Sequence, residues 1–337
     1  MDAIKLEAPV EVFSTCPPSS TGDLDTYLDR VAEIAAWSEQ AGCKGILVYS
    51  DNSQMDAWSV SQVILQHTTS LCPLVAVQPI YLHPYTVAKT LTSIGALWRR
   101  RMYLNMVAGG FKNDLVALND TTPHDSRYDR LAEYTLIIRQ LLESHSSVTF
   151  RGEFYQVENL RMMPPLPAEL FPGIFISGSS DAGLAAARRI GATAIKYPKP
   201  ANEEAPGAAT DLSTGIRVGI IARPRGADAW QVARDRFPED RKGQITRQLA
   251  TKVSDSVWHK QLAERDEQEP HSPYWLVPFN NYHTMCPYLV GSYEEIAAEL
   301  SRHFANGSRS VILDVPPSRE ELQHTFAAFT LALQPVP

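Results

Sequence analysis

The sequence predicts a (β/α)₈ TIM barrel with insertions, a closed ring of eight parallel strands with helices between them. Eight short runs of strand character recur along the 337 residues, and helical patterns separate nearly all of them. The composition does not change between the two halves, so residues 1–337 are expected to form a single domain. A doubly wound open sheet with a second domain is the competing fold, but no G-x-G-x-x-G motif follows the first run.

The predicted strands are short apolar runs bounded by Pro, Gly or polar residues. They cover Val10–Thr15, Gly45–Tyr49, Leu74–Gln78, Met102–Val107, Ile174–Ile176, Ala192–Tyr197, Ile216–Ala222 and Ser310–Val315. The stretches between them carry apolar residues at helical spacing and end at helix-stop residues such as Gly42 and Gly191. Outside the turn region described below, the predicted helices cover Leu24–Ala41, Ala57–Gln66, Tyr85–Trp98, Tyr128–Glu143, Ala227–Phe237, Gln244–Arg265, Ser292–Phe304 and Arg319–Leu333.

Two segments interrupt the alternation of strands and helices. Residues 148–157 (VTFRGEFYQV) alternate in polarity around a Gly, which predicts a small hairpin insertion. Residues 266–288 are too long and Pro-rich for one helix, yet they include Tyr274, Trp275 and Phe279. Because this segment precedes the last strand, where loops reach over the mouth of a barrel, it is predicted to be a lid. The alternative is that its aromatic residues pack permanently against neighbouring helices or a second subunit.

Composition argues against several classes of function. The net charge of −7 and the pI near 5.7, without a long basic run, argue against a nucleic-acid-binding surface. The four cysteines form no C-x-x-C motif and the nine histidines no H-E-x-x-H motif, so no metal site is expected. No apolar run reaches the roughly 20 residues that span a bilayer, and the first residues lack a signal-peptide pattern. We therefore expect a cytoplasmic protein with no membrane partner.

The stretch Gly173–Tyr197 has the pattern of a strand, a polar turn, a helix and a second strand. Its turn contains Gly178, Ser179 and Ser180 at the point where the helix begins. Free backbone N–H groups and the positive end of the helix dipole make such a turn an anion site, and the two hydroxyls can donate to phosphate oxygens. The alternative is that Ser180 or Asp181 only caps the helix.

In a barrel the active site lies at the carboxyl ends of the strands. The residues predicted there are Cys16, Asp51 to Gln54, Gln78, Asn105 to Gly110, Ser177 to Ser180, Lys196 to Tyr197, Arg223 and Asp314. The set contains neither a carboxylate pair for glycoside hydrolysis nor a His/Asp cluster for a metal. A site without its own strong nucleophile or metal indicates a cofactor that carries the chemistry.

Four motifs at these positions resemble one known family. They are Asp56-Ala57-Trp58, Asn105-Met106-Val107-Ala108-Gly109, His124-Asp125-Ser126-Arg127-Tyr128 and Gly178-Ser179-Ser180-Asp181. In their order and spacing they resemble the motifs of the bacterial luciferase-like flavin monooxygenases. The resemblance is closest to the FMNH₂-dependent alkanesulfonate monooxygenase branch, and it runs from about Asp25 to Ala332.

The resemblance implies that reduced FMN binds at the carboxyl ends of the strands and activates O₂ to oxygenate a small organic substrate. The implied cofactor-binding residues are Gln78, Asn105, Ala108, Tyr128, Gly178, Ser179 and Ser180, with Ala108 standing where the family usually has Thr. Such enzymes usually receive reduced flavin from a separate NAD(P)H:flavin reductase, and this chain has no nicotinamide fingerprint. The expected assembly is a homodimer or homotetramer.

The substrate positions differ from those of the sulfonate branch. Gly219 stands where that branch has an active-site His, Tyr282 where it has an anion-binding Arg, and Pro316 where it has a Tyr. Gln54 replaces its Cys, and Cys16 replaces a His. The loss of two cationic groups removes charge-assisted contacts that a sulfonate needs, so a simple alkanesulfonate is not the expected substrate.

The candidate catalytic residues are Arg217, which matches the sulfonate branch, Tyr197, which stands for its Trp, His124 and Gln54. Alternatives remain open, since His124 can be an ordinary loop or cap residue and Arg217 can form an ion pair inside the barrel. Two other functions also remain open, namely hydride transfer with a deazaflavin, which related barrels use, and flavin binding without catalysis.

Overall fold

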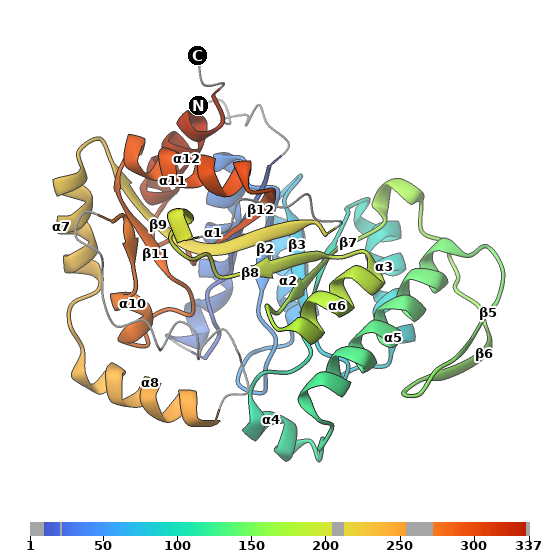
Figure 1. Cartoon of the computed structure of the whole chain (residues 1–337). Helices are drawn as coiled ribbons and strands as arrows, with labels where there is room; N and C mark the ends of the chain where they lie inside the picture. The colour runs from blue at the N-terminus through green and yellow to red at the C-terminus, as the bar shows by residue number, and fades with distance from the viewer. Residues whose placement is uncertain (1–9, 21, 204–211, 254–271, 335–337) are drawn as a thin grey trace.

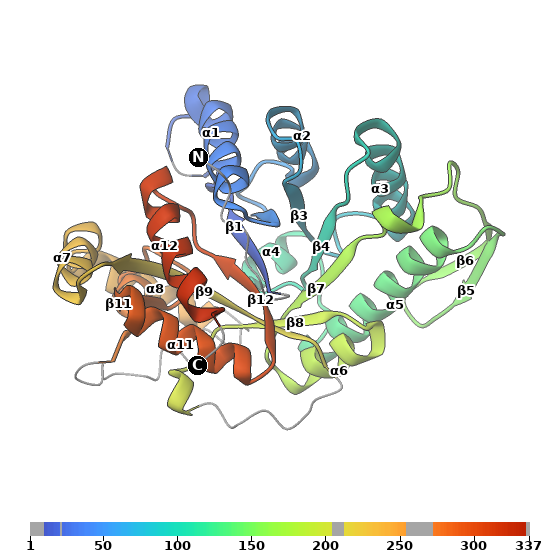
Figure 2. The same ribbon diagram turned by 90° about the horizontal axis from the view of Figure 1, so that it is seen from above.

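The computed structural model describes residues 10–20, 22–203, 212–253 and 272–334 of the chain. Eight parallel strands form a closed barrel with helices around it (Figures 1 and 2). These strands are β1 (Glu11–Thr15), β2 (Gly45–Val48), β3 (Cys72–Val77), β4 (Tyr103–Met106), β7 (Gly173–Ser177), β8 (Thr193–Lys196), β9 (Thr214–Arg223) and β12 (Ser308–Leu313). They pair in chain order, and the pairing of β12 with β1 closes the ring. The predicted TIM barrel is therefore confirmed.

The helices lie outside the barrel (Figure 2). They are α1 (Tyr27–Ala41), α2 (Ala57–His67), α3 (Pro84–Trp98), α4 (Lys112–Ala117), α5 (His124–Glu143), α6 (Asp181–Ile190), α7 (Gly226–Arg236), α8 (Arg241–Val253), α10 (Val277–Asn280), α11 (Tyr293–Ala305) and α12 (Arg319–Ala332). The predicted helix Gln244–Arg265 is present up to Val253, and the rest of it lies outside the described residues. None of the described helices is long and apolar enough to cross a membrane.

A ninth parallel strand, β11 (Tyr288–Ser292), extends the sheet beside the second half of β9. It can form because β9 is ten residues long and β8 pairs only with Thr214–Ile216, which leaves the backbone groups of that edge free to pair from Gly219 onward. The two-residue strand β10 (Tyr274–Trp275) adds to β11 in antiparallel orientation. Neither strand was predicted from the sequence.

Residues 148–160 form the hairpin expected from the sequence, with strands β5 (Val148–Arg151) and β6 (Gln156–Leu160). The Glu133 carboxylate on α5 accepts backbone N–H groups from Glu153 at 2.8 Å and from Phe154 at 2.9 Å, so it fixes the turn to the barrel wall.

The described part of the predicted lid is folded against the protein. Tyr274, Trp275 and Phe279 are buried, and the Trp275 ring lies edge-on to that of Trp230, with 5.7 Å between centroids. Tyr282, in contrast, is 37% exposed. Residues 266–271 lie outside the described residues. The described contacts are those expected for a packed segment, and motion of residues 266–288 stays a prediction.

Apolar side chains fill the middle of the barrel. They come from β1, β2, β3, β4, β7, β8 and β12 and include Phe13, Leu47, Leu74, Tyr103, Phe175, Ile195 and Ile312. The Phe13 ring lies edge-on to Tyr103 at 5.0 Å and to Phe175 at 5.1 Å between centroids. Because side chains alternate along a strand, the residues two positions further on also point inward, nearer the carboxyl end. This alternation determines which side chains line the carboxyl end of the barrel interior, where the candidate site lies.

Candidate active site

A layer of polar side chains lies above the apolar filling, at the carboxyl end of the barrel. Two positions after the core residues of their strands come Thr15, Tyr49, Asn105, Ser177, Tyr197 and Asp314. Arg217 follows Gly215 in the same way on β9. The predicted residues Arg217, Tyr197 and Asn105 therefore belong to one layer, because alternation brings them to the same level of the barrel.

The Arg217 side chain crosses the interior of the barrel. Its Nη2 atom donates to the hydroxyl of Tyr49, and its guanidinium carbon lies 5.1 Å from the centroid of the Tyr49 ring. Strands β9 and β2 are not neighbours in the ring of strands, so this contact requires both side chains to point inward. The Nε atom of Arg217 is buried and has no hydrogen-bond partner in the described chain. Since Nε is enclosed and Nη2 bonds to Tyr49, the donor that Arg217 keeps available is its other terminal nitrogen, Nη1.

The surroundings of Arg217 favour its positive charge. Burial lowers the pKa of the guanidinium, but Tyr49, Tyr197, Cys286 and Asp314 raise it by more, so that the pKa lies above its usual value. Burial raises the pKa of Tyr49 and of Tyr197, and Arg217 opposes that shift only in part. At neutral pH the layer thus holds a fixed cation beside two neutral phenols.

Tyr288 completes this wall from outside the ring of eight strands. It lies opposite Gly219 in the pairing of β11 with β9, and a Cβ atom at Gly219 would come within 2.3 Å of its ring. The Tyr288 hydroxyl donates to Oδ2 of Asp314 at 2.8 Å. Tyr288 thus occupies the space that a side chain at residue 219 would need.

The polar turn begins helix α6. The Ser180 Oγ atom accepts a hydrogen bond from the N–H of Gly183 at 3.2 Å. Ser180 therefore caps the helix, which is the alternative that the sequence left open. Gly178 packs so closely on Tyr128 of α5 that a Cβ atom there would lie 2.5 Å from the Tyr128 hydroxyl. The first turn of α6 leaves backbone N–H groups without intrahelical acceptors. Gly178, Ser179, Ser180 and Tyr128 are therefore brought together as predicted.

His124 lies beside this turn. Its Nδ1 atom is 2.7 Å from Oδ1 of Asp125, and its ring lies edge-on to that of Tyr128, with 5.3 Å between centroids. Burial raises the pKa of Tyr128, and its hydrogen bond with Ser180 lowers it by less. His124 thus contacts Tyr128, which packs on the predicted phosphate turn, whereas no described contact joins it to Arg217.

Three further predicted cofactor residues line the carboxyl end. Asn105 is buried, and its Oδ1 atom accepts the Ser177 hydroxyl at 2.8 Å, which leaves its amide nitrogen as a donor. Gln78 donates to the Ser50 carbonyl at 2.9 Å and so links the ends of β2 and β3. Ala108 is buried just after β4. These three residues lie at or just after the carboxyl ends of β3 and β4, which are neighbouring strands, so they lie along one side of the barrel mouth.

The fourth predicted catalytic residue, Gln54, connects two loops. Its Oε1 atom accepts the backbone N–H of Ser19 at 2.7 Å, and its Nε2 atom donates to the Ser20 hydroxyl at 2.7 Å. Both ends of the amide are thus engaged in holding the loop after β1 to the loop after β2. Cys16 is buried, and burial raises the pKa of its thiol to about 12, so it is a neutral apolar group at neutral pH.

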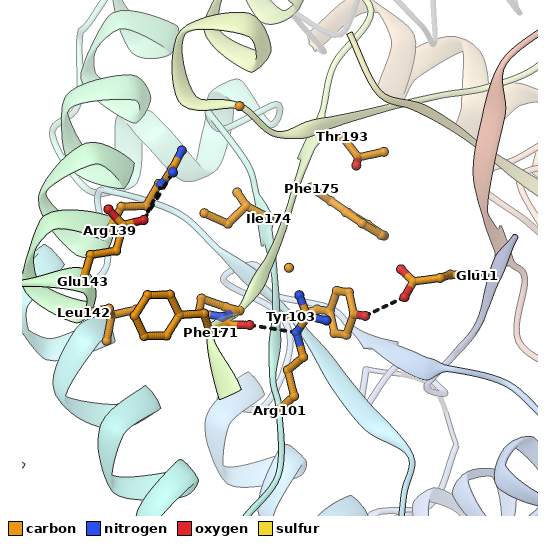
Figure 3. A pocket seen from close by; sticks show the side chains of 13 residues that line it. Glu11, Arg101, Tyr103, Arg139, Leu142, Glu143, Phe171, Ile174, Phe175 and Thr193 are labelled. Carbon is orange, nitrogen blue, oxygen red and sulfur yellow. Dashed lines mark hydrogen bonds and ion pairs between the residues drawn. The ribbon is translucent and has the colours of Figure 1, made fainter. Parts of the chain in front are cut away.

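A cavity of about 390 Å³ lies at the opposite, amino-terminal end of the barrel (Figure 3). Polar groups that line it are already hydrogen-bonded to each other. The Tyr103 hydroxyl donates to Glu11 at 2.8 Å, and Arg101 donates to the Phe171 carbonyl at 2.7 Å. Barrel enzymes work at the carboxyl end, so this cavity is not assigned to catalysis. Among the described residues there is also no cluster of three or more His, Cys, Asp or Glu that could hold a metal ion.

Two residues of the site, Tyr49 and Tyr288, were not predicted, whereas Asp314 was predicted at the carboxyl end of its strand without an assigned role. Alternation would have identified Tyr49, because it lies two residues after Leu47. No sequence signal indicates Tyr288, since its strand lies outside the ring of eight.

Comparison with known proteins settles the family. The family model for luciferase-like monooxygenases matches residues 10–308. The chain belongs to this family. A curated relative from Niallia circulans, 4-(γ-L-glutamylamino)butanoyl-[BtrI acyl-carrier protein] monooxygenase BtrO, is 36% identical over 308 residues, 88% of this chain and 89% of its own. Monooxygenase activity is thus the activity of both the family and this relative.

Solved structures share the fold at low sequence identity. Long-chain alkane monooxygenase LadA superposes with a TM-score of 0.72 at 13% identity, over 96% of this chain and 90% of its own. An F420-dependent secondary alcohol dehydrogenase superposes with a TM-score of 0.64 at 16% identity, over 96% of this chain and 99% of its own. The barrel of this luciferase-like chain is therefore shared by proteins whose names give different reactions and cofactors.

Proposed function

We propose that the protein is a two-component monooxygenase that uses reduced FMN and O₂ to oxygenate an acyl-type organic substrate. The observation that carries the proposal is the position of the turn at residues 178–180. The turn and the polar layer around Arg217 lie at the same end of the barrel, so one ligand can contact both. A flavin mononucleotide can contact both regions, because it carries a phosphate at one end and a ring system at the other.

The turn fits a phosphate. Gly178 has no room for a side chain, so the backbone there lies against Tyr128, and the Ser179 hydroxyl has no described partner in the protein. The N-terminus of the ten-residue helix α6 adds N–H donors and the positive end of a dipole. We assign the phosphate to Ser179, the Tyr128 hydroxyl and the backbone of residues 178–181. Ser180 contributes by capping α6 and so holding those N–H groups in place.

The ring side fits an aromatic heterocycle with amide groups. Asn105 offers its amide nitrogen, Gln78 positions the loops that flank the ring, and buried Ala108 leaves space beside it. Bound reduced FMN supplies the activation of O₂. The part played by the protein is to exclude water and to hold the substrate near the ring, which the packed barrel interior below the polar layer supports.

The roles assigned to the four candidate catalytic residues differ. Arg217 holds an anionic group of the substrate through its terminal nitrogen Nη1, and Tyr197 forms the adjoining aromatic wall. His124 positions Tyr128 at the phosphate end. Gln54 closes the mouth by holding two loops together. Of these four, only Arg217 and Tyr197 are therefore placed next to the reacting substrate.

The substrate class is proposed from two observations. Gly219, covered by Tyr288, supplies no cation for a sulfonate, and Tyr282 is partly exposed rather than part of the polar layer. The relative BtrO carries in its name an acyl group bound to an acyl-carrier protein. We therefore propose an acyl thioester as substrate, a separate NAD(P)H:flavin reductase as partner, a cytoplasmic setting, and a homodimer or homotetramer as the assembly.

The proposal is tested by supplying cofactors separately. The protein should bind FMN, and oxidation of NAD(P)H coupled to substrate turnover should require an added flavin reductase. Binding of deazaflavin F420 without FMN would instead favour hydride transfer, and FMN binding without turnover of any acyl thioester would favour a flavin-binding protein. Alkanesulfonates of one to ten carbons should release no sulfite at the roughly 1–1000 s⁻¹ typical of enzymes.

A further inference from the structure

The polar layer contains two opposite charges that do not pair with each other. Arg217 enters from β9 and Asp314 from the end of β12, and these strands are neighbours. Among the described residues, neither side chain forms an ion pair within 4.0 Å. Both side chains are half-buried, so each keeps part of its surface exposed.

Each charge is instead held in place by a tyrosine. The Tyr49 hydroxyl accepts a hydrogen bond from Arg217, and the Tyr288 hydroxyl donates to Asp314. Each of these bonds uses one polar atom of the charged group, and among the described residues neither Nη1 of Arg217 nor Oδ1 of Asp314 has a hydrogen-bond partner. The two tyrosines thus hold a donor and an acceptor of opposite charge beside each other.

The charge of Arg217 is stabilised where it lies, because Tyr49, Tyr197 and Asp314 favour the charged form. Each of the two charged groups can nevertheless take one more hydrogen bond, at Nη1 of Arg217 and at Oδ1 of Asp314. A ligand that carries both an anionic and a cationic group would supply both bonds.

We propose that Arg217 and Asp314 bind the two charges of a zwitterionic head group, so that the substrate is an acyl chain ending in an amino acid. Arg217 binds the carboxylate and Asp314 binds the ammonium. This inference rests on the proposed function, since it names the substrate class of the same site. Both contacts are charge-assisted hydrogen bonds, the strong kind, and together they require both charges in one ligand.

The name of the relative BtrO is consistent with this chemistry. A γ-linked glutamyl group leaves its α-amino and α-carboxyl groups free, so the acyl chain named there ends in a zwitterion. The inference for the present chain is carried by its own Arg217 and Asp314 and extends to amino-acid-terminated acyl chains as a class.

The test compares four pantetheine thioesters that differ only in the head group. They are the γ-glutamylaminobutanoyl thioester, its deaminated glutaryl analogue, its decarboxylated aminobutyryl analogue, and the plain butyrylaminobutanoyl compound. Affinity is measured by calorimetry on the FMN-loaded protein without reductant, so no turnover is involved. We expect the zwitterion to bind at least about 10-fold more tightly than either singly charged probe. Equal affinity of all four probes, or no binding of any, overturns the inference.

Two variants assign each charge to its residue. Asp314→Asn keeps an acceptor for Tyr288 and should weaken the two ammonium-bearing probes about 10-fold, with little change for the glutaryl probe. Arg217→Gln should weaken the two carboxylate-bearing probes by a similar factor. A variant that weakens all four probes alike contradicts the assignment. FMN affinity, measured on the same samples, should stay unchanged and confirms that each variant is folded.

The outcome is independent of the proposed function. A protein that binds FMN and oxygenates a neutral acyl thioester, but shows no preference for the zwitterion, retains the proposed function and loses this inference. A protein that binds the zwitterion selectively but never incorporates oxygen retains the inference about the site and loses the monooxygenase assignment.

Discussion

The ring of Tyr288 occupies the space that a side chain at Gly219 would fill, and a Cβ atom on Gly219 would lie 2.3 Å from it. The two residues are register partners in β11 and β9, so neither can move away without breaking the strand pairing. Gly219→Ala should therefore lower the free energy of unfolding by roughly 1–3 kcal/mol, as overpacking does in cores. Urea denaturation of the two proteins measures this difference in the free energy of unfolding.

The control for this substitution is Gly110→Ala, because a Cβ atom there would meet nothing within 4 Å. Its unfolding free energy should stay within about 0.5 kcal/mol of the unaltered protein. In the double variant Gly219→Ala/Tyr288→Leu the smaller side chain should restore part of the loss. If both glycine variants have the same stability, the packing of Tyr288 on Gly219 does not explain the glycine.

The second prediction concerns the phosphate of FMN. Ser179→Ala leaves the cap of α6 intact, and removal of its hydroxyl from a charged acceptor should weaken FMN binding about 10-fold. Adding Ser180→Ala also removes the cap and should weaken binding further. Ser318→Ala, which removes the equivalent cap of α12, should cost stability without changing FMN affinity. Unchanged FMN affinity in the Ser179→Ala/Ser180→Ala variant would place the phosphate elsewhere.

The third prediction is a pH dependence of stability. Burial raises the pKa of Asp120, but hydrogen bonds from Arg130 and Thr122 lower it by more, to about 2 from a usual value of 3.8. A folded-state pKa below the unfolded value gives stability that is complete above about pH 4 and is lost as the pH falls through 2. The difference in unfolding free energy between the unaltered protein and Asp120→Asn should be about 2 kcal/mol larger at neutral pH than near pH 2. A difference that is constant with pH would show that Asp120 is not ionised in this ion pair.

The fourth prediction concerns the lid. Amides of residues 276–282 should exchange faster than those of β11 in the free protein, and they should slow when FMN and an acyl thioester bind. Strand β11 is the internal control, since its backbone pairs with β9. Tyr274 and Trp275 are left out of the comparison, because they are buried and pair with β11. Equal protection of the segment in both states would show that it is structural.

The barrel could be predicted from the sequence because each of its strands is a short apolar run bounded by turn residues, and helical spacing separates most of them. Strand β11 could not, since Tyr288–Ser292 is a strand only because β9 extends beyond β8 and offers free backbone groups on that edge. Helix α4 was missed for a similar reason, because Lys112–Ala117 is short and mostly polar and buries only Leu115.

The site could be predicted in part. The rule that catalytic residues follow the strands identified Tyr197 and Asn105, because it depends only on chain order. On β9 (Thr214–Arg223) that rule selected Arg223, and Arg217 was predicted from the family resemblance instead. The rule did not show that Gln54 would be engaged by Ser19 and Ser20, since that contact joins two loops whose relative position is set by the fold. Side-chain contacts between distant segments are not encoded in local spacing, and they decide which polar residues remain available for a ligand.

The central claim is that this chain inserts oxygen from O₂ into its substrate. The direct test is mass spectrometry of the product formed from the γ-glutamylaminobutanoyl thioester, with reduced FMN and isotopically labelled dioxygen. The account predicts a product that carries one labelled oxygen atom, and none when dioxygen is absent. A product without label, or a substrate that changes only by the gain or loss of hydrogen, would contradict the account.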